Sequence, residues 1–159
     1  MQKQKITVWH LEEMENVISD VIGGDLKAPT PRKFLRIFCR ASGFDKHAQL
    51  CNIARFFVDL ALITNLTKKF APSLIAISAL RLALTRTKQL TRQQVIPFEQ
   101  LAANHDMMAI HSGFAPNDMY LCQRALCNNH SQLLADETKN SLFEKFKFAQ
   151  INQVIMYEC

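Results

Sequence analysis

Glycine and proline are both scarce in this 159-residue chain, which has four of the first and five of the second. Because turn-rich β folds use many such residues, this scarcity disfavours them and leaves room for long helices. Apolar residues, by contrast, are not lacking, since 48% of the chain is hydrophobic and eleven residues are phenylalanine. Disordered chains are poor in these residues, and a chain of this length is typical of one domain. We therefore expect one folded, mainly helical domain.

Two further absences concern the compartment. No signal peptide with a charged start and an apolar centre opens the chain, because Met1 is followed by polar residues. The longest apolar run, from Leu74 to Leu84, is interrupted by Ser78 and Arg81 and falls well short of the ~20 residues that span a membrane. The five cysteines are an odd number in a chain that is not short. We expect a soluble protein with free thiols in a reducing compartment and no membrane partner.

The charge is only mildly unbalanced, at +5 near neutral pH. Such a balance permits an acidic partner surface or nucleic acid but requires neither. A basic set could touch phosphate, although no aromatic residues alternate with it as they do on a stacking platform. This set is Arg81, Arg86, Lys88 and Arg92. We interpret it as a solvated face, and nucleic acid is not the expected partner.

Six segments carry apolar residues at spacings of three and four, the pattern of amphipathic helices. They span residues 8–22, 31–42, 46–62, 72–84, 98–112 and 116–134, followed by a short packed segment with Leu142, Phe143, Phe146 and Phe148. Gly23-Gly24 ends the first helix and Gly43 the second, while the polar stretch from Thr85 to Gln94 is interpreted as a connection. No run alternates with period two over enough residues for a strand. The pattern predicts an all-α bundle.

Local signals predict how the second helix begins and packs. Thr30 is a favourable N-cap, and Pro31 suits the first helical position, where its missing N–H has no partner to lose. We expect this helix to bury Phe34, Leu35, Ile37 and Phe38.

The third and fourth helices are expected at the centre of the bundle. Asp45 is predicted to cap the third, which is apolar on most sides, and Arg55 and Asp59 are four residues apart on it and could pair. The fourth carries alanine at positions 76, 79 and 83, which lets a neighbouring backbone come close.

Several short blocks occur in an order that one family shares. Residues 14–18 (Met-Glu-Asn-Val-Ile), Asp25-Leu26 and residues 28–31 followed by Phe34-Leu35 make up the first group. Residues 54–62, 70–84 and 111–122 follow, and then Glu144-Lys145-Phe146. Together they resemble the cyclin family, in particular the mitotic A- and B-type cyclins. The first group is similar to the junction between the two cyclin boxes, and the rest to the second box.

The resemblance implies a cyclin-like five-helix bundle around a central helix, preceded by one extra helix. Residues 1–27 would be the last helix of a first cyclin box and a linker, 28–150 the C-terminal cyclin box, and 151–159 a tail. The chain departs from the family at Gly23-Gly24, where a bulky residue is usual, and between Thr85 and Pro97, where a tryptophan is expected. The rest of the first box, which supplies most of the kinase-binding surface in cyclins, is not part of this sequence.

Two positions acquire candidate roles from the resemblance. Glu15 matches the glutamate with which cyclins contact their kinase, so it is the candidate kinase-contacting residue; the alternative is a solvated helix carboxylate like Glu12 and Glu13. In the family this glutamate works with a lysine on an earlier helix that this sequence does not contain. The segment from Thr30 to Lys33 has the pattern that proline-directed kinases phosphorylate, but we favour a helix cap there.

Other chemistry-bearing residues do not form a convincing site. Cys122 and Cys127 would lie about 140° apart around one helix, so with His130 they could not easily share a zinc ion. His105, Asp106 and His111 are poorly spaced for acid–base work, and no nucleophile accompanies them. We expect no metal, no cofactor and no enzyme activity.

The function implied by the resemblance is that of a regulatory subunit, which binds and activates a cyclin-dependent protein kinase in cell-cycle control. Such a protein would work in the nucleus and cytoplasm, by stabilising the active arrangement of the kinase. An alternative is a cyclin-fold scaffold or a nucleic-acid or protein interaction module similar to transcription factor IIB, which a salt-dependent affinity for DNA would support. The apolar side of residues 8–22 would normally pack on the first box, and without it this helix could drive self-association.

Overall fold

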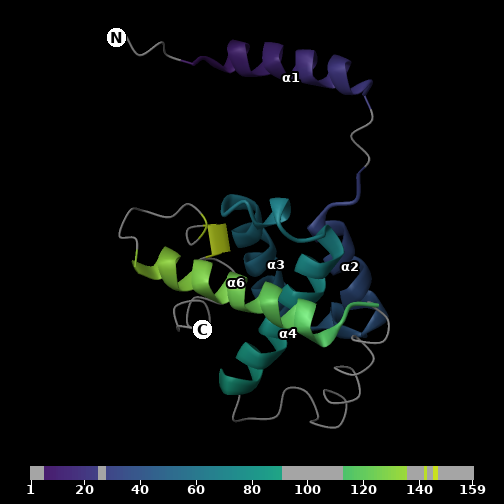
Figure 1. The fold of residues 1–159 in the computed structure, drawn as a ribbon, viewed down its shortest axis with the longest axis vertical. Helices are drawn as coiled ribbons and strands as arrows, with labels where there is room; N and C mark the ends of the chain where they lie inside the picture. Colours follow the sequence, from purple (N-terminus) through teal and green to yellow (C-terminus); the bar gives the residue numbers. More distant parts are fainter. Residues whose placement is uncertain (1–5, 25–27, 91–112, 136–141, 143–144, 147–159) are drawn as a thin grey trace.

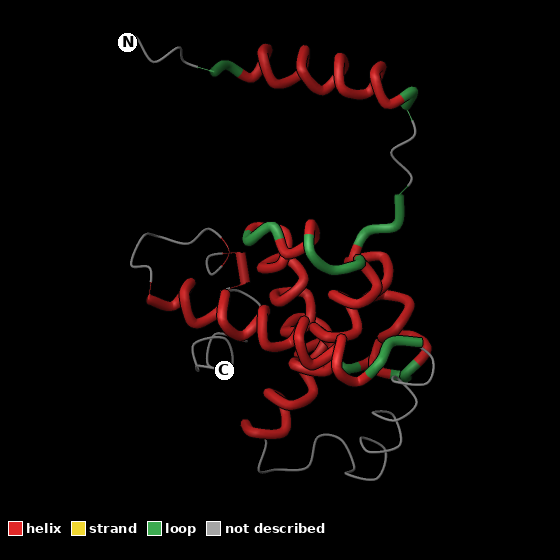
Figure 2. Tube along the Cα trace, viewed as in Figure 1, coloured by secondary structure: helices red, strands yellow, loops and turns green. Residues whose placement is uncertain are grey.

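A computed structural model describes residues 6–24, 28–90, 113–135, 142 and 145–146. Its helices are α1 (Val8–Ile22), α2 (Pro31–Ala41), α3 (Ala48–Ile63), α4 (Pro72–Leu90) and α6 (Pro116–Ala135), with short 3-10 helices η1 (Phe44–Lys46) and η2 (Leu66–Lys68). The described residues include no strand (Figure 2), which confirms the all-α prediction. The helix predicted over residues 98–112 lies outside the described residues.

Helices α3 and α4 form the centre of the bundle, as predicted. Each contacts the other and also α2 and α6 (Figure 1). Ten of the sixteen residues of α3 are buried, and the alanines at 76, 79 and 83 of α4 are completely buried. Because alanine side chains are small, the two backbones can pack closely there. Among the described helices, none combines the length and the apolar character needed to cross a membrane.

Helix α2 begins as the sequence predicts. The Thr30 side chain accepts a hydrogen bond from the Lys33 backbone N–H at 3.3 Å, and Pro31 occupies the first helical position. The burial predicted for Ile37 is wrong, because its side chain is 51% exposed. The buried stripe follows Pro31, Leu35 and Cys39 at steps of four, and a residue two positions from Leu35 points about 200° away from it.

The start of α3 differs from the prediction that Asp45 caps it. Asp45 lies inside η1, and the residue before the helix is His47, whose side chain makes no capping hydrogen bond. The chain turns at Gly43, which has a left-handed φ of 71°, and then buries Phe44 in the core. Because Phe44 is buried, the chain forms a short 3-10 turn over Phe44–Lys46, and α3 begins only after it.

Helix α4 continues to Leu90, so the first part of the predicted connection from Thr85 to Gln94 is wrong. The hydroxyl of Thr85 donates to the Arg81 carbonyl at 3.1 Å and that of Thr87 to the Ala83 carbonyl at 2.8 Å, which satisfies both within the helix. Arg86 and Thr87 are buried because they lie three and four residues after Ala83, on the same packed face of the helix. The solvated face predicted for the basic set is therefore wrong at Arg86, and Arg81 is half-buried.

Candidate protein-interaction site

Helix α1 is a well-capped helix that stands outside the bundle. At its start Thr7 and His10 form a reciprocal box, in which the His10 N–H donates to Thr7 Oγ1 and the Thr7 N–H donates to His10 Nδ1. At its end Gly23 and Gly24 both adopt a φ of 70°, and their N–H groups donate to Asp20 and Ser19. The predicted bounds and the glycine stop are confirmed.

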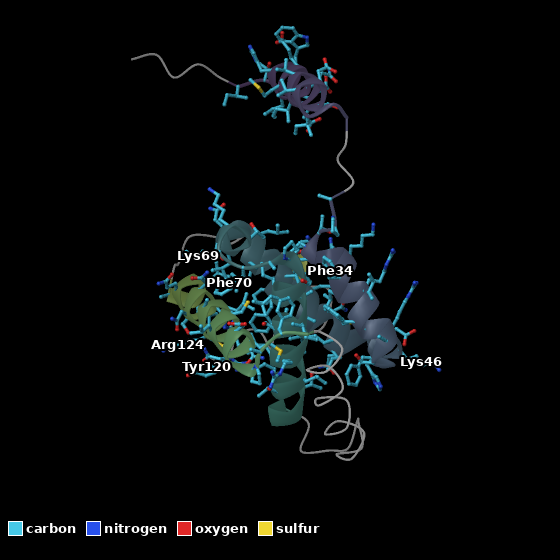
Figure 3. The ribbon with its side chains drawn as sticks, turned by 45° about the vertical axis from the view of Figure 1, so that its right-hand side comes forward. Phe34, Lys46, Lys69, Phe70, Tyr120 and Arg124 are labelled. Carbon is cyan, nitrogen blue, oxygen red and sulfur yellow. The ribbon has the colours of Figure 1, made fainter. Side chains whose placement is uncertain are left out.

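The apolar residues of α1 are all exposed, and the helix contributes no buried residue (Figure 3). Their side chains are between 48% and 82% exposed, a set made up of Val8, Trp9, Leu11, Met14, Val17, Ile18, Val21 and Ile22. A continuous apolar surface of this kind is typical of an interaction site rather than of a free monomer surface. We call it the α1 stripe, meaning the face that carries Val8, Leu11, Ile18 and Ile22.

Glu15 lies within the α1 stripe, unlike its acidic neighbours. At about 100° per residue it is about 40° from Leu11 and about 20° from Ile22. Glu12 lies near the edge of the stripe, and Glu13 on the opposite side, about 200° from Leu11. Glu15 is exposed and pairs with no described residue. A partner that covered the stripe would cover Glu15 as well, and would have to supply a donor for its carboxylate.

A basic groove lies between α2 and α3, with a volume of about 830 Å³. We call it the α2–α3 groove. Five cationic side chains and one carboxylate line it: Arg32, Lys33, Arg36, Arg40 and Arg55 with Asp45. The predicted Arg55–Asp59 pair is wrong, since Arg55 Nη1 donates to Asn52 Oδ1 at 3.0 Å on this groove while Asp59 is buried elsewhere. The groove is thus a candidate surface for an acidic ligand or segment.

Two cysteines also line the α2–α3 groove, and each shifts the pKa of the other. Cys39 is on α2 and Cys51 is on α3, and their side chains interact at the groove. The interaction with Cys39 lowers the pKa of Cys51 to about 7, with help from the nearby Arg55 charge. The interaction with Cys51, together with burial, raises the pKa of Cys39. Spacing alone gave no sign of the pair, because eleven residues that include a turn separate the two cysteines.

A second hollow of about 530 Å³ lies beside the N-terminus of α2. Its lining includes Leu62 and Ile63, which are exposed at the end of α3, and a partly buried ion pair. Lys145 Nζ contacts Asp59 Oδ2 at 2.6 Å, and ties the segment near Leu142 and Phe146 to α3. The predicted final packed segment is confirmed at Leu142 and Phe146, while Phe143 and Phe148 lie outside the described residues.

The remaining candidates are structural or lie beyond the described residues. Cys122 is buried, and burial raises its pKa, while His130 is buried against the rings of Phe56 and Phe57 at 5.7 and 5.8 Å. Within the described ranges, no group of three or more His, Cys, Asp or Glu residues could hold a metal ion. His105, Asp106 and His111 fall outside those ranges. The four described cysteines (39, 51, 122 and 127) form no disulfide.

Comparison with known proteins now decides the family. A family profile described as "Cyclin, C-terminal domain" matches residues 29–159, from the cap of α2 through the whole bundle. The chain belongs to the cyclin family. The all-α fold and the resemblance seen in the sequence are thereby confirmed, and the cyclin family is regulatory rather than catalytic. No solved structure was found that matches the chain.

The similar curated proteins are mitotic or B-type cyclins. The chain is 28% identical over 141 residues to Cyclin-B2-1 of Oryza sativa subsp. japonica, covering 86% of this chain and 30% of that protein. It is 28% identical over 145 residues to Cyclin-B1-5 of the same plant, covering 91% and 29%. A G2/mitotic-specific cyclin, S13-6 of Glycine max, is 28% identical over 124 residues, covering 78% and 24%. The chain therefore spans about 30% of the length of the first of these relatives.

Proposed function

We propose that this cyclin chain is part of a regulatory subunit that binds and activates a cyclin-dependent protein kinase during cell division. Membership of the family and its likeness to mitotic cyclins support the proposal. The observation that carries it furthest is the α1 stripe with Glu15 inside it, an exposed apolar face that needs a partner. The proposal includes α1 as the last helix of a first cyclin box, the division near residue 27, and a place of work in the nucleus and cytoplasm.

The mechanism is positional. A partner that covers the α1 stripe removes Leu11, Ile18 and their neighbours from water, which favours association by roughly 25 cal/mol for each Å² of apolar surface. Glu15 then lies inside a desolvated contact, where a charge-assisted hydrogen bond to the kinase is stronger than in water. Any activation follows from tighter binding to the active than to the inactive kinase.

The nucleic-acid alternative has one observation in its favour, the cationic lining of the α2–α3 groove. The kinship with mitotic cyclins favours the kinase instead, and the groove is equally suited to an acidic protein segment.

The test compares two forms of the protein against a mitotic cyclin-dependent kinase. One form is the 159-residue chain, and the other is the same chain joined at its N-terminus to the first cyclin box of a B-type relative. We expect the joined form to bind and to raise phosphorylation of a peptide substrate. Glu15→Lys should weaken binding at least about tenfold, since a reversed charge is left at the contact.

The matched control is Glu13→Lys, which makes the same charge change on the opposite side of α1 and should alter the affinity by less than about twofold. Binding by neither form would overturn the kinase proposal. If Glu15→Lys and Glu13→Lys lost the same amount of kinase affinity, the loss would come from the change in net charge, and Glu15 would not be a contact residue.

A further inference from the structure

The two thiols at the α2–α3 groove come from different helices. Cys39 is in the last turns of α2 and Cys51 is in the first turn of α3, with Gly43 and η1 between them. Neither cysteine forms a disulfide, both line the groove, and their side chains interact. The Cys51 thiol donates a hydrogen bond to the Phe44 carbonyl oxygen at 3.2 Å. The backbone turn that buries Phe44 therefore brings the two cysteines to one groove.

The surroundings of this pair suit oxidation better than those of Cys122. Thiols react as thiolates, and the Arg55 charge and the interaction with Cys39 both favour the thiolate of Cys51. Both cysteines line a groove of about 830 Å³, which gives a small oxidant a route to them although their side chains are largely buried. Cys122, by contrast, lies inside the core, where burial disfavours its thiolate.

We propose that Cys39 and Cys51 form a redox-active dithiol, which hydrogen peroxide oxidises to a disulfide between α2 and α3. In the first step the Cys51 thiolate attacks one peroxide oxygen, the O–O bond breaks, and the leaving hydroxide takes up a proton to become water. In the second step Cys39 sulfur attacks the resulting sulfenic acid, an S–S bond forms, and the Cys39 proton leaves with the hydroxyl as water. Two thiols and one peroxide thus give one disulfide and two waters.

The disulfide would close a short ring across η1. Because α2 packs on α3 and both cysteines line one groove, side-chain movements can bring the sulfur atoms to the S–S bond length of about 2 Å. The ring runs from Cys39 to Cys51 and holds the end of α2 against the start of α3. It also removes the Cys51 thiolate from the cationic lining, so the oxidised groove is more positive than the reduced one. Dithiol reductants reverse the step. The proposal does not depend on kinase binding.

The test treats the reduced, folded 159-residue chain with one equivalent of hydrogen peroxide, blocks the remaining thiols and digests the protein with trypsin. Cleavage after Arg36, Arg40, Lys46 and Arg55 places the two cysteines in separate peptides, residues 37–40 and 47–55. We expect these two peptides to be joined by a disulfide. We also expect the rate of formation to rise with pH through about 7 and thermal unfolding of the oxidised form to occur roughly 5–10 °C higher.

Variants make the test specific. Cys39→Ser should leave a sulfenic acid on Cys51 that dimedone traps, and Cys51→Ser should abolish peroxide reactivity at Cys39, whereas Cys127→Ser should leave the linked peptide unchanged. Arg55→Gln should move the pH midpoint of the reaction upward, while Arg40→Gln, which removes a charge of the same groove, should move it less. Absence of the linked peptide from the folded protein, or its formation only in urea, would overturn the proposal.

Discussion

At the scale of single residues, Asp59 shows how the fold satisfies a charge that it buries. Its side chain is 9% exposed on a helix that lies at the centre of the bundle, and its partner Lys145 is 86 residues away in the chain. A carboxylate in such a place is unfavourable unless it is paired. Lys145 is 53% exposed, so it approaches from the solvent side and loses little hydration itself. The pair stabilises the fold chiefly because the Asp59 carboxylate would otherwise be buried without a cationic partner.

This geometry predicts that Lys145→Gln destabilises the protein although lysine is half-exposed. We expect the free energy of unfolding to fall by about 1–2 kcal/mol, more than for an exposed ion pair but less than for a fully buried one, because solvent screens one partner. Urea unfolding followed by circular dichroism measures it. Lys69→Gln, at an exposed lysine (Figure 3), is the control and should change the value by less than about 0.5 kcal/mol.

A double-mutant cycle identifies the partner. If Asp59→Asn removes the unpaired charge, Lys145→Gln should have little further effect in that background. Additive losses in the double variant would mean that Lys145 stabilises the protein through some contact other than Asp59.

The candidate site could be predicted from sequence only in part, and the residues show why. Glu15 and Thr30 were found because their signals are local: one lies on a helix stripe and the other directly before Pro31. The kinase contact at Glu15 stays a prediction. Cys39 with Cys51, and Asp59 with Lys145, were missed because each pairing depends on how segments from different elements approach one another. No spacing rule along the chain encodes that approach.

At the scale of elements, the errors fall where burial outweighs local preference. Thr85 and Thr87 are weak helix formers in a polar stretch, yet α4 continues through them because Ala83, Arg86 and Thr87 remain on its packed face. Asp45 is a good cap by residue type, yet the buried ring of Phe44 sets a 3-10 turn before α3. Correct predictions, such as the start of α2 and both ends of α1, rest on caps that need no tertiary partner.

Helix α1 leads to a prediction about its own removal. Because it contributes no buried residue, a chain that starts at residue 25 should unfold with a free energy within about 1 kcal/mol of the full chain. Urea unfolding of both chains checks this. If copies of the chain associate through the α1 stripe, self-association measured by sedimentation should decrease in the shorter chain. A loss of several kcal/mol would show instead that α1 packs on the bundle.

At the scale of the whole molecule, the thiols on three helices make stability depend on alkaline pH. The pKa values of Cys39 and Cys122 are raised, so these groups stabilise the fold below the unfolded thiol pKa of about 8.5 and do so less as pH rises above it. The pKa of Cys51 is lowered to about 7, so its contribution is lost as pH falls through that value.

We therefore expect the free energy of unfolding in the presence of a reductant to be greatest near pH 8 and to decline toward pH 10. Urea unfolding at steps of pH measures it, and Cys122→Ser should reduce the alkaline decline because serine does not titrate there. A flat profile between pH 8.5 and pH 10 in the native chain would contradict the assignment.

Local patterns in the sequence were enough to predict the helical class, the glycine stop of α1, the Thr30 cap of α2, the apolar character of α3 and the alanine face of α4. These follow from the spacing of apolar residues and from local hydrogen bonds, which act within one or two helical turns. The ordered blocks of residues were enough to predict the likeness to cyclins. Packing sets the exposure of α1, the extension of α4 to Leu90, and the approach of Lys145 to Asp59 and of Cys39 to Cys51. Those outcomes depend on which faces of distant segments exclude water together, and that is a property of packing rather than of any local pattern.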